Sequence, residues 1–453
     1  MIKKFLLLSL VASQLMVSCS SDDSDKTETE QTFEEQIADL LKKPYSSLTP
    51  SQQKTKLEVE ANEMLTQLDK TKSSGAIEAF ENLARLLGVN EIDIFAGKNG
   101  NKAEDILNIS GVYGIYTWNN TNQVWVKTAS TTELKFVFPA KKSQTTNNTV
   151  FTSKGVSSDI KVKYYDSYVY TPNVGGKEIY DSIFLPTSSD AVLTIDNVQA
   201  ATFALTAKYV NGKEIPTEST IKLTLNDGYV WEMSSLKAST NTGKAALTFN
   251  GKTLIDFYGG SNSEIDKLLD DKELIQYRGK ANGLFKLMDN FVIVADMDLA
   301  TSAADDIASE KSLTYPNYLN NSDPKSDYKA YYTAVNAYNK KYSEASVSNF
   351  NKNFKLILVS KKDGTKIAEI IQHSQKEESS RWDTFNLPIW DANNKYWVSY
   401  SDKGEPFTAL YYSEVLYLKF NDNTEVEMSV YFSEGFEKFE AKFEDYIKSF
   451  EKK

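Results

Sequence analysis

The sequence contains one cysteine, Cys19, and one histidine, His373, and this scarcity excludes several kinds of chemistry. One cysteine cannot form a disulfide within the chain, so packing alone must hold the fold together. Zinc and iron–sulfur sites need several cysteine or histidine ligands. A serine hydrolase needs a histidine base beside its nucleophile, and no Gly-x-Ser-x-Gly sequence is present. We interpret His373 as a residue at the end of a strand or in a loop.

The chain also lacks a glycine-rich phosphate loop, a basic patch and, after residue 18, any apolar run of membrane-spanning length. Its 62 acidic residues outnumber 51 basic ones, which gives a formal net charge of −11. Proteins that bind nucleic acids need clustered lysine and arginine, and anionic lipid surfaces repel an acidic chain. We therefore expect no nucleic-acid partner, no nucleotide or other cofactor, and no transmembrane helix in the mature chain.

Acidic side chains are too widespread to identify a site by themselves. Asp296, Asp298, Asp305, Asp306 and Asp422 could offer oxygen ligands to calcium, but none has the spacing of a calcium-binding loop. A pair of carboxylates could hydrolyse a glycosidic bond, yet no motif singles out such a pair. We predict no catalytic residue and no metal ligand.

The first 18 residues have the pattern of a secretory signal peptide. Lys3 and Lys4 give it a basic start, and residues 5–17 form an apolar stretch. This stretch is too short to cross a bilayer as a helix, so residues 1–18 are predicted to be a signal and no part of the fold.

The end of this signal resembles the lipobox of bacterial lipoproteins. Leu15 or Met16 provides the large apolar residue, and Ser18 is the small residue directly before Cys19. The resemblance implies cleavage before Cys19 and acylation of both its sulfur and the new amino terminus. Each buried CH₂ group contributes about 0.8 kcal/mol, so several chains would anchor the protein stably in the lipid of the outer membrane.

A polar, acidic segment follows the cysteine. Residues 19–31 contain no apolar residue after Cys19 and are predicted to form a disordered tether. The acidic run at residues 20–25 resembles the export signal of surface lipoproteins in Bacteroidota, whereas a generic linker is the alternative. The resemblance covers only about the first 25 residues, and it implies an outer-membrane lipoprotein displayed at the cell surface.

The next segment, residues 32–105, is predicted to be helical. Thr49-Pro50 reads as the start of a helix, and a second helix is expected at residues 75–87 with Gly88 as its C-terminal cap. Apolar residues recur at helical spacing in both. These helices would form a small bundle or a cap that rests on the rest of the fold.

Residues 106–275 are predicted to form an antiparallel β-rich domain. Asn211-Gly212, Asp227-Gly228 and Asn250-Gly251 each separate stretches of alternating apolar residues. Such dipeptides are the strongest short-range signal of a hairpin, and three of them in about forty residues indicate a meander.

Residues 276–453 are predicted to form a mixed α+β domain. The apolar runs at 291–295 and 354–359 indicate strands covered on both faces, and residues 327–342 read as a tyrosine-rich helix. Phenylalanines at helical spacing between 436 and 450 predict a closing helix. The fold class is therefore α+β, dominated by antiparallel sheet, with an N-terminal helical region and a C-terminal helix.

Three of the six tryptophans, Trp382, Trp390 and Trp397, fall within sixteen residues of one another. Polar residues lie among them, including Asp391 and Asn393. Sugar rings stack their C–H faces on aromatic planes while their hydroxyls bond to polar neighbours, so this segment is a candidate for glycan contact. The alternative is that these large aromatics fill a core.

Taken together, the residues indicate a non-enzymatic binding or structural module held at the membrane. One alternative is a carrier of a small lipid or other amphiphile, enclosed by a curved sheet that helices close. A second alternative is a carboxylate-dependent glycoside hydrolase. Lipid that co-purifies would favour the first, and turnover of a chromogenic glycoside the second.

Overall fold

The computed structural model describes residues 32–70, 74–89, 112–270, 277–288, 290–378, 380 and 383–433. Its large sheet contains sixteen strands. They are β1 (Gly114–Asn119), β2 (Val124–Thr128), β3 (Leu134–Phe138), β4 (Thr149–Thr171), β5 (Gly175–Ile195), β6 (Val198–Lys208), β7 (Glu218–Leu225), β8 (Tyr229–Leu236), β9 (Asn241–Phe249), β10 (Lys252–Ser261), β11 (Lys280–Leu287), β12 (Phe291–Asp298), β13 (Phe354–Ser360), β14 (Thr365–Lys376), β19 (Tyr412–Lys419) and β20 (Glu425–Glu427). The helices are α2 (Phe33–Leu41), α3 (Pro50–Asp69), α4 (Gly75–Val89), α6 (Ile265–Asp270), α7 (Leu299–Ser312), α8 (Tyr328–Asn353) and α9 (Met428–Tyr431).

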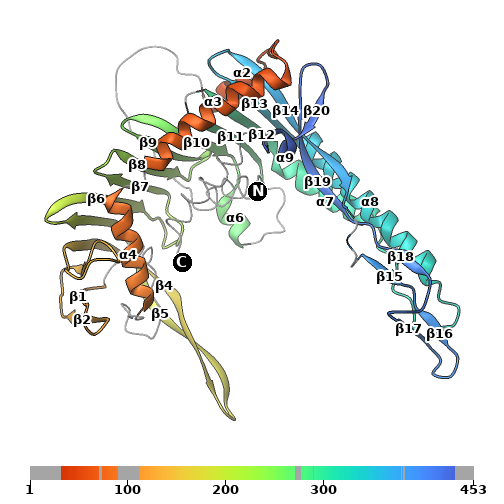
Figure 1. Cartoon of the computed structure of the whole chain (residues 1–453), viewed down its shortest axis with the longest axis horizontal. Coiled ribbons are helices and arrows are strands. Elements are labelled where there is room, and N and C mark those ends of the chain that lie inside the picture. Colours follow the sequence, from red (N-terminus) through yellow and green to blue (C-terminus); the bar gives the residue numbers. More distant parts are fainter. Residues whose placement is uncertain are drawn as a thin grey trace.

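The sheet is a long meander that bends into an arch (Figure 1). From β3 to β14 each strand lies beside the next one in sequence, and β19 and β20 complete that edge. Among the described pairs of named strands, only β1 and β3 run parallel. The predicted α+β class dominated by antiparallel sheet is therefore confirmed. The sheet continues across residue 275, because β10 pairs with β11.

The predicted turns are present. Asp227-Gly228 joins β7 to β8, and Asn250-Gly251 joins β9 to β10 with both residues at positive φ. Asn211-Gly212 lies in the longer connection from β6 to β7. Positive φ is open to glycine and tolerated by asparagine, which is why these pairs mark the hairpins.

Helix α3 starts where the sequence predicts, through a capping box. The Thr49 hydroxyl accepts a hydrogen bond from the Gln52 amide at 3.3 Å, and the Gln52 side chain accepts one from the Thr49 amide at 2.9 Å. The expected cap at Gly88 is wrong, because α4 continues through Gly88 to Val89.

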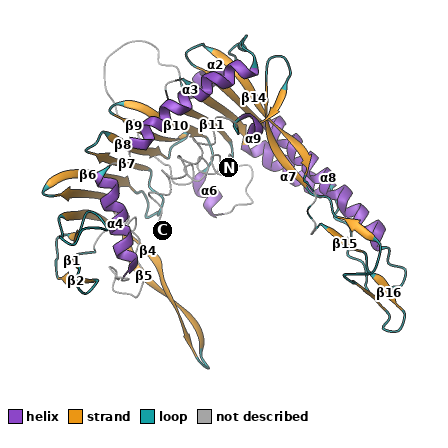
Figure 2. Cartoon of the chain, in the orientation of Figure 1, coloured by secondary structure: helices purple, strands orange, loops and turns teal. Residues whose placement is uncertain are grey.

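The helices cover both faces of the sheet (Figure 2). Helix α4 packs its apolar side on one end, where Leu83 and Phe136 are fully buried in the same cluster. Helix α3 packs on β12 and β13 beside Phe291, whereas α2 packs on their opposite face beside Val292 and Val294. The prediction that residues 291–295 and 354–359 are covered on both faces is confirmed.

Several predictions fall outside the described residues: the signal at 1–18, Cys19, the tether at 19–31 and the closing helix at 436–450. In the part of the chain that the structure describes, no helix is both long enough and apolar enough to cross a membrane.

Candidate functional site

One end of the arch extends into an arm built on α7 and α8, together with the ends of β14 and β19 (Figure 1). Polar side chains hold the two helices together. The Asn353 side chain donates to Asp305 at 2.8 Å, and Lys352 pairs with the same carboxylate at 2.7 Å. The Asn349 side chain donates to the Ser302 carbonyl at 2.8 Å.

Asparagines on α8 also bind the chain beside it in the way a neighbouring strand would. The Asn336 side chain donates to the Thr408 carbonyl at 3.0 Å and accepts from the Leu410 amide at 2.9 Å. Asn351 makes the same two contacts with the Gln372 backbone, at 2.9 and 2.8 Å. Because these amides satisfy peptide groups at the edge of the arm, α8 is a rigid support for the hairpins at its far end.

Two small two-stranded sheets, which we call the arm hairpins, form the far end of the arm. In one, β15 (Thr384–Asn386) pairs with β18 (Pro406–Thr408), and in the other β16 (Ile389–Asp391) pairs with β17 (Tyr396–Val398). The Tyr332 ring on α8 lies 4.8 Å from Phe385 and 5.8 Å from Phe407, measured between ring centroids. Aromatic packing therefore joins the β15–β18 pair to the start of α8.

The structure brings Trp390 and Trp397 together as a cross-strand pair, with ring centroids 6.0 Å apart and the rings at 64°. Trp397 is anchored, because its indole N–H donates to the Asp323 carbonyl at 2.8 Å and its ring lies 5.2 Å from Tyr328. Trp390 is half-buried. Trp382, the third predicted contact, lies outside the described residues.

The turn between these tryptophans is organised by Asp391. Its carboxylate accepts from the backbone amides of Asn393 at 2.8 Å and Asn394 at 3.1 Å, and from the Asn394 side chain at 2.9 Å. These hydrogen bonds, led by those of Asn394, hold the pKa of the Asp391 carboxyl below its usual range. The carboxylate stays charged and sets the register that pairs Trp390 with Trp397.

A second group of aromatic rings, which we call the tyrosine row, lies along α8 and the segment before it, and reasoning from the sequence did not single it out. Tyr318 is 86 % exposed. Burial is the main cause and a hydrogen bond with Tyr315 the second of a rise in the pKa of Tyr331 to about 12. The tyrosine-rich composition of residues 327–342 was the only sequence signal for this row. Its members are Tyr315, Tyr318, Tyr331, Tyr338 and Tyr342, linked by ring contacts of 5.0 to 6.4 Å.

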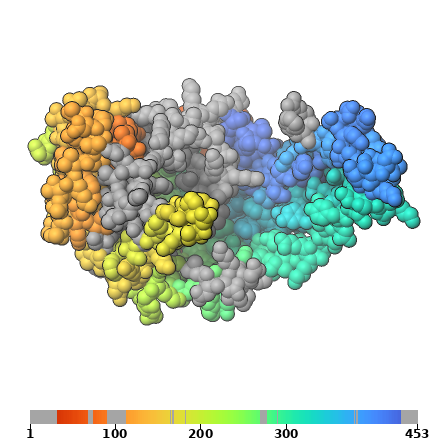
Figure 3. All heavy atoms as spheres, turned by 90° about the horizontal axis from the view of Figure 1, so that it is seen from below, coloured from red at the N-terminus to blue at the C-terminus, as the bar shows by residue number. Residues whose placement is uncertain are grey.

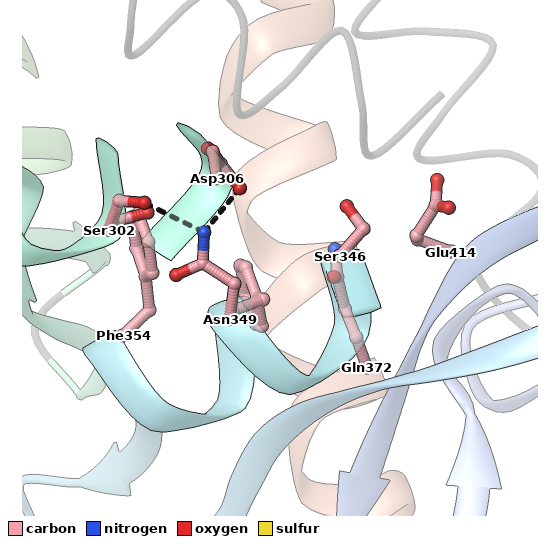
Figure 4. A pocket seen from close by; sticks show the side chains of 8 residues that line it. Ser302, Asp306, Ser346, Asn349, Phe354, Gln372 and Glu414 are labelled. Atoms are coloured by element: carbon pink, nitrogen blue, oxygen red, sulfur yellow. Dashed lines mark hydrogen bonds between the residues drawn. The ribbon is translucent and has the colours of Figure 1, made fainter. Parts of the chain in front are cut away.

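A depression of about 230 Å³ lies at the other end of α8 (Figure 4). In Figure 4, Asn349 is joined by hydrogen bonds to Ser302 and Asp306, whereas Glu414 comes from a strand on the opposite side. Hydroxyl, amide and carboxylate groups can bind a polyol, but the volume is below the usual range for small-molecule pockets, about 300–1,000 Å³. The residues lining it are Ser302, Asp306, Ser346, Asn349, Phe350, Phe354, Gln372 and Glu414.

His373 and the acidic candidates occupy places where local structure accounts for them. His373 lies near the end of β14, with its imidazole 2.6 Å from Glu425 and its ring against Tyr417. Asp298 caps α7 by accepting from the Thr301 amide at 2.9 Å. Across the described ranges, no three acidic, histidine or cysteine side chains gather as metal ligands would.

Comparisons with known proteins identify no relative for this chain. No family model matches it, no curated protein matches it, and no solved structure matches it. A function therefore has to be argued from its own residues.

Proposed function

We propose that the protein is an outer-membrane lipoprotein, displayed at the cell surface, that acts as a non-enzymatic binding module and contacts glycans with the end of its arm. The lipobox-like residues before Cys19 and the acidic run after it support the anchoring and the display. The aromatic rings at the end of the arm support the binding.

The observation that carries the binding proposal is the Trp390–Trp397 pair on a hairpin at the far end of a braced arm. Trp390 lies half-buried beside a turn rich in amide and carboxylate groups. A ring held in this way offers an apolar plane for the C–H face of a sugar, with hydrogen-bonding groups at its edge. The rigid support reduces the entropy lost when a ligand binds.

The two tryptophans are expected to have different roles. Trp397 has both its N–H and its ring engaged within the arm, so its replacement would disturb the hairpin. Both rings are half-buried, and we assign the contact with the ligand to Trp390 because Trp397 is the one whose N–H is bound within the arm. Trp390→Ala is therefore the change that tests contact, and Trp397→Ala is the change that tests support.

We expect Trp390→Ala to weaken glycan binding while the protein stays folded. An aromatic contact contributes about 0.5–1.5 kcal/mol, so affinity should fall roughly two- to tenfold. The measurement is glycan-array binding and affinity electrophoresis of the chain from Ser20 onward, with circular dichroism as the folding check. Tyr170→Ala is the control, because Tyr170 is 67 % exposed on a hairpin far from the arm. The proposal is wrong if the unaltered chain binds no glycan. It is also wrong if Trp390→Ala binds glycans as well as the unaltered chain.

Display at the cell surface makes a separate prediction about the acidic run. Replacing Asp22, Asp23 and Asp25 with alanine should move the protein from a protease-accessible to a protected location on intact cells, because the export signal is lost. Protease shaving followed by immunoblotting measures this. Replacing Ser20 and Ser21 with alanine is the control and should leave the protein accessible. Equal accessibility of both variants would count against the signal.

The lipid-carrier alternative requires space between the sheet and its helices. Leu83, Leu86 and Leu87 of α4 are almost fully buried against Phe136 and its neighbours, so side chains already fill this part of the apolar face. Mass spectrometry of an organic extract of the purified protein tests the alternative directly. Assays with chromogenic glycosides test the hydrolase alternative.

A further inference from the structure

The hairpin formed by β4 and β5 extends well beyond the sheet that carries it. Strand β3 pairs with β4 only as far as Ser153, and β6 pairs with β5 only from Ser188 onward. Beyond these points, the described pairings of β4 and β5 are with each other alone. The end of the hairpin projects on the same side of the arch as the arm, and Figure 3, seen from that side, shows the two apart.

The end of this hairpin is uncharged and rich in exposed aromatic and aliphatic side chains. Residues 168–176, which we call the hairpin tip, read Tyr-Val-Tyr-Thr-Pro-Asn-Val-Gly-Gly and contain no charged residue, in a chain whose net charge is −11. Its large side chains are exposed in the isolated molecule: Tyr168 by 59 %, Val169 by 46 %, Tyr170 by 67 % and Val174 by 83 %.

Specific packing holds the hairpin in shape up to this tip. Tyr165 and Tyr180 face each other across the strands with ring centroids 5.8 Å apart. The Tyr168 side chain lies over Gly176, where a Cβ atom would collide with the tyrosine hydroxyl. An aromatic ring that covers a cross-strand glycine is a device that stabilises exposed β-structure. The Tyr168 ring is therefore held against the ribbon at the base of the tip.

The apolar groups of the tip lie on both faces of the ribbon. Strand alternation places Tyr168 and Tyr170 on one face and Val169 on the other, and Val174 lies in the turn. A protein that docks on one face would leave the other exposed, whereas an apolar medium surrounds both. The free edges of the ribbon must keep their hydrogen bonds to water, because unpaired peptide groups are costly in hydrocarbon. The interfacial region of a bilayer offers both apolar groups and water, and tyrosine is enriched there.

We propose that the hairpin tip inserts into the interfacial layer of a bilayer with neutral, zwitterionic headgroups. The absence of charge in residues 168–176 removes both attraction to and repulsion from charged lipids. Residues 161–184 around it contain three lysines and three acidic residues, a balance that suits headgroups carrying both charges. Lys177, which follows the tip directly, can extend its ammonium group to a lipid phosphate while its stem stays among apolar groups. This contact is independent of the glycan proposal, which concerns the arm at the other end of the arch.

A single reporter thiol tests the proposal, because the chain from Ser20 onward contains no cysteine. Val174→Cys carries an environment-sensitive fluorophore at the tip. Val198→Cys is the matched control, since each valine follows an asparagine at positive φ in a hairpin turn and both are exposed, by 83 % and 63 %. Vesicles of phosphatidylcholine and phosphatidylethanolamine should raise the emission and shift it to the blue at position 174 and not at 198.

Vesicle flotation supplies the second measurement. Tyr170→Asp should lower the vesicle-bound fraction about tenfold, because it removes an interfacial ring and introduces a charge, while circular dichroism stays unchanged. Three outcomes would overturn the proposal. The first is an unchanged emission at position 174 when vesicles are added. The second is an emission that rises with protein concentration in the absence of vesicles, which would indicate pairing with a second copy. The third is binding only to anionic vesicles at low salt.

Discussion

Replacing Cys19 with serine should abolish incorporation of fatty acid into the protein. The sulfur is the only thiol in the chain, and the resemblance of its surroundings to a lipobox makes it the expected point of acylation. A single acyl chain gives only marginal membrane binding, whereas two or more hold a protein stably, at about 0.8 kcal/mol for each buried CH₂ group. The resemblance implies that acylation of the sulfur comes first and that cleavage and acylation of the amino terminus follow it, so loss of the sulfur should remove every acyl chain.

Metabolic labelling with a clickable fatty acid and intact mass measurement test this prediction. The label should fall to background in Cys19→Ser, and the mature chain of the unaltered protein should carry the mass of its acyl groups. Ser18→Ala serves as the control because it keeps a small residue before the cysteine, so its label should persist. A mature chain without acyl mass would contradict the lipoprotein interpretation.

The sequence was most informative where burial leaves a simple pattern of apolar residues, either on one face of an element or on both. The turns at Asp227-Gly228 and Asn250-Gly251 could be predicted because alternating strands flank residues that tolerate positive φ. The runs at 291–295 and 354–359 could be interpreted because strands covered on both faces lose their polar residues. In both cases burial leaves a pattern, alternation in the first and a continuous apolar run in the second, that can be recognised without knowing the packing partners.

Elements without a buried face escaped prediction. Every described side chain from 165 to 180 is exposed, so the end of the β4–β5 hairpin has no apolar period to recognise. Helix α7 buries only Ala303 and consists largely of small and polar residues, so its apolar spacing is weak. Its clearest sequence signal was Asp298, which acts as the N-terminal cap.

The candidate site was predictable in composition and unpredictable in geometry. The density of tryptophan at residues 382–397 indicated a special segment. The hydrogen bond from Trp397 to the Asp323 carbonyl joins positions more than seventy residues apart, and local sequence carries no sign of it. That contact is what separates the anchored Trp397 from Trp390. The tyrosine row likewise depends on how the segment before α8 folds back along the helix.

Truncating Phe136 should cause a large loss of stability. Its side chain is fully buried in β3, lies 5.2 Å from Tyr116 at 12° and meets the edge of Trp125 at 5.6 Å. Phe→Ala changes in such cores cost about 3–5 kcal/mol, through lost transfer free energy and the cavity left behind. Urea unfolding of the chain from Ser20 onward, followed by tryptophan fluorescence, measures the difference.

Phe184→Ala is the matched control, because the same atoms are removed from a ring that is 38 % exposed, and it should cost about 1 kcal/mol or less. Similar losses for both variants would mean that α4 does not pack on this end of the sheet as described.

The Phe136 variant also bears on the carrier alternative. An apolar cavity lined by aliphatic and aromatic groups binds small apolar molecules. The space under α4 should therefore bind such a ligand in Phe136→Ala and should not bind it in the unaltered protein. Tight binding by the unaltered protein would instead show that the sheet and α4 enclose a pocket.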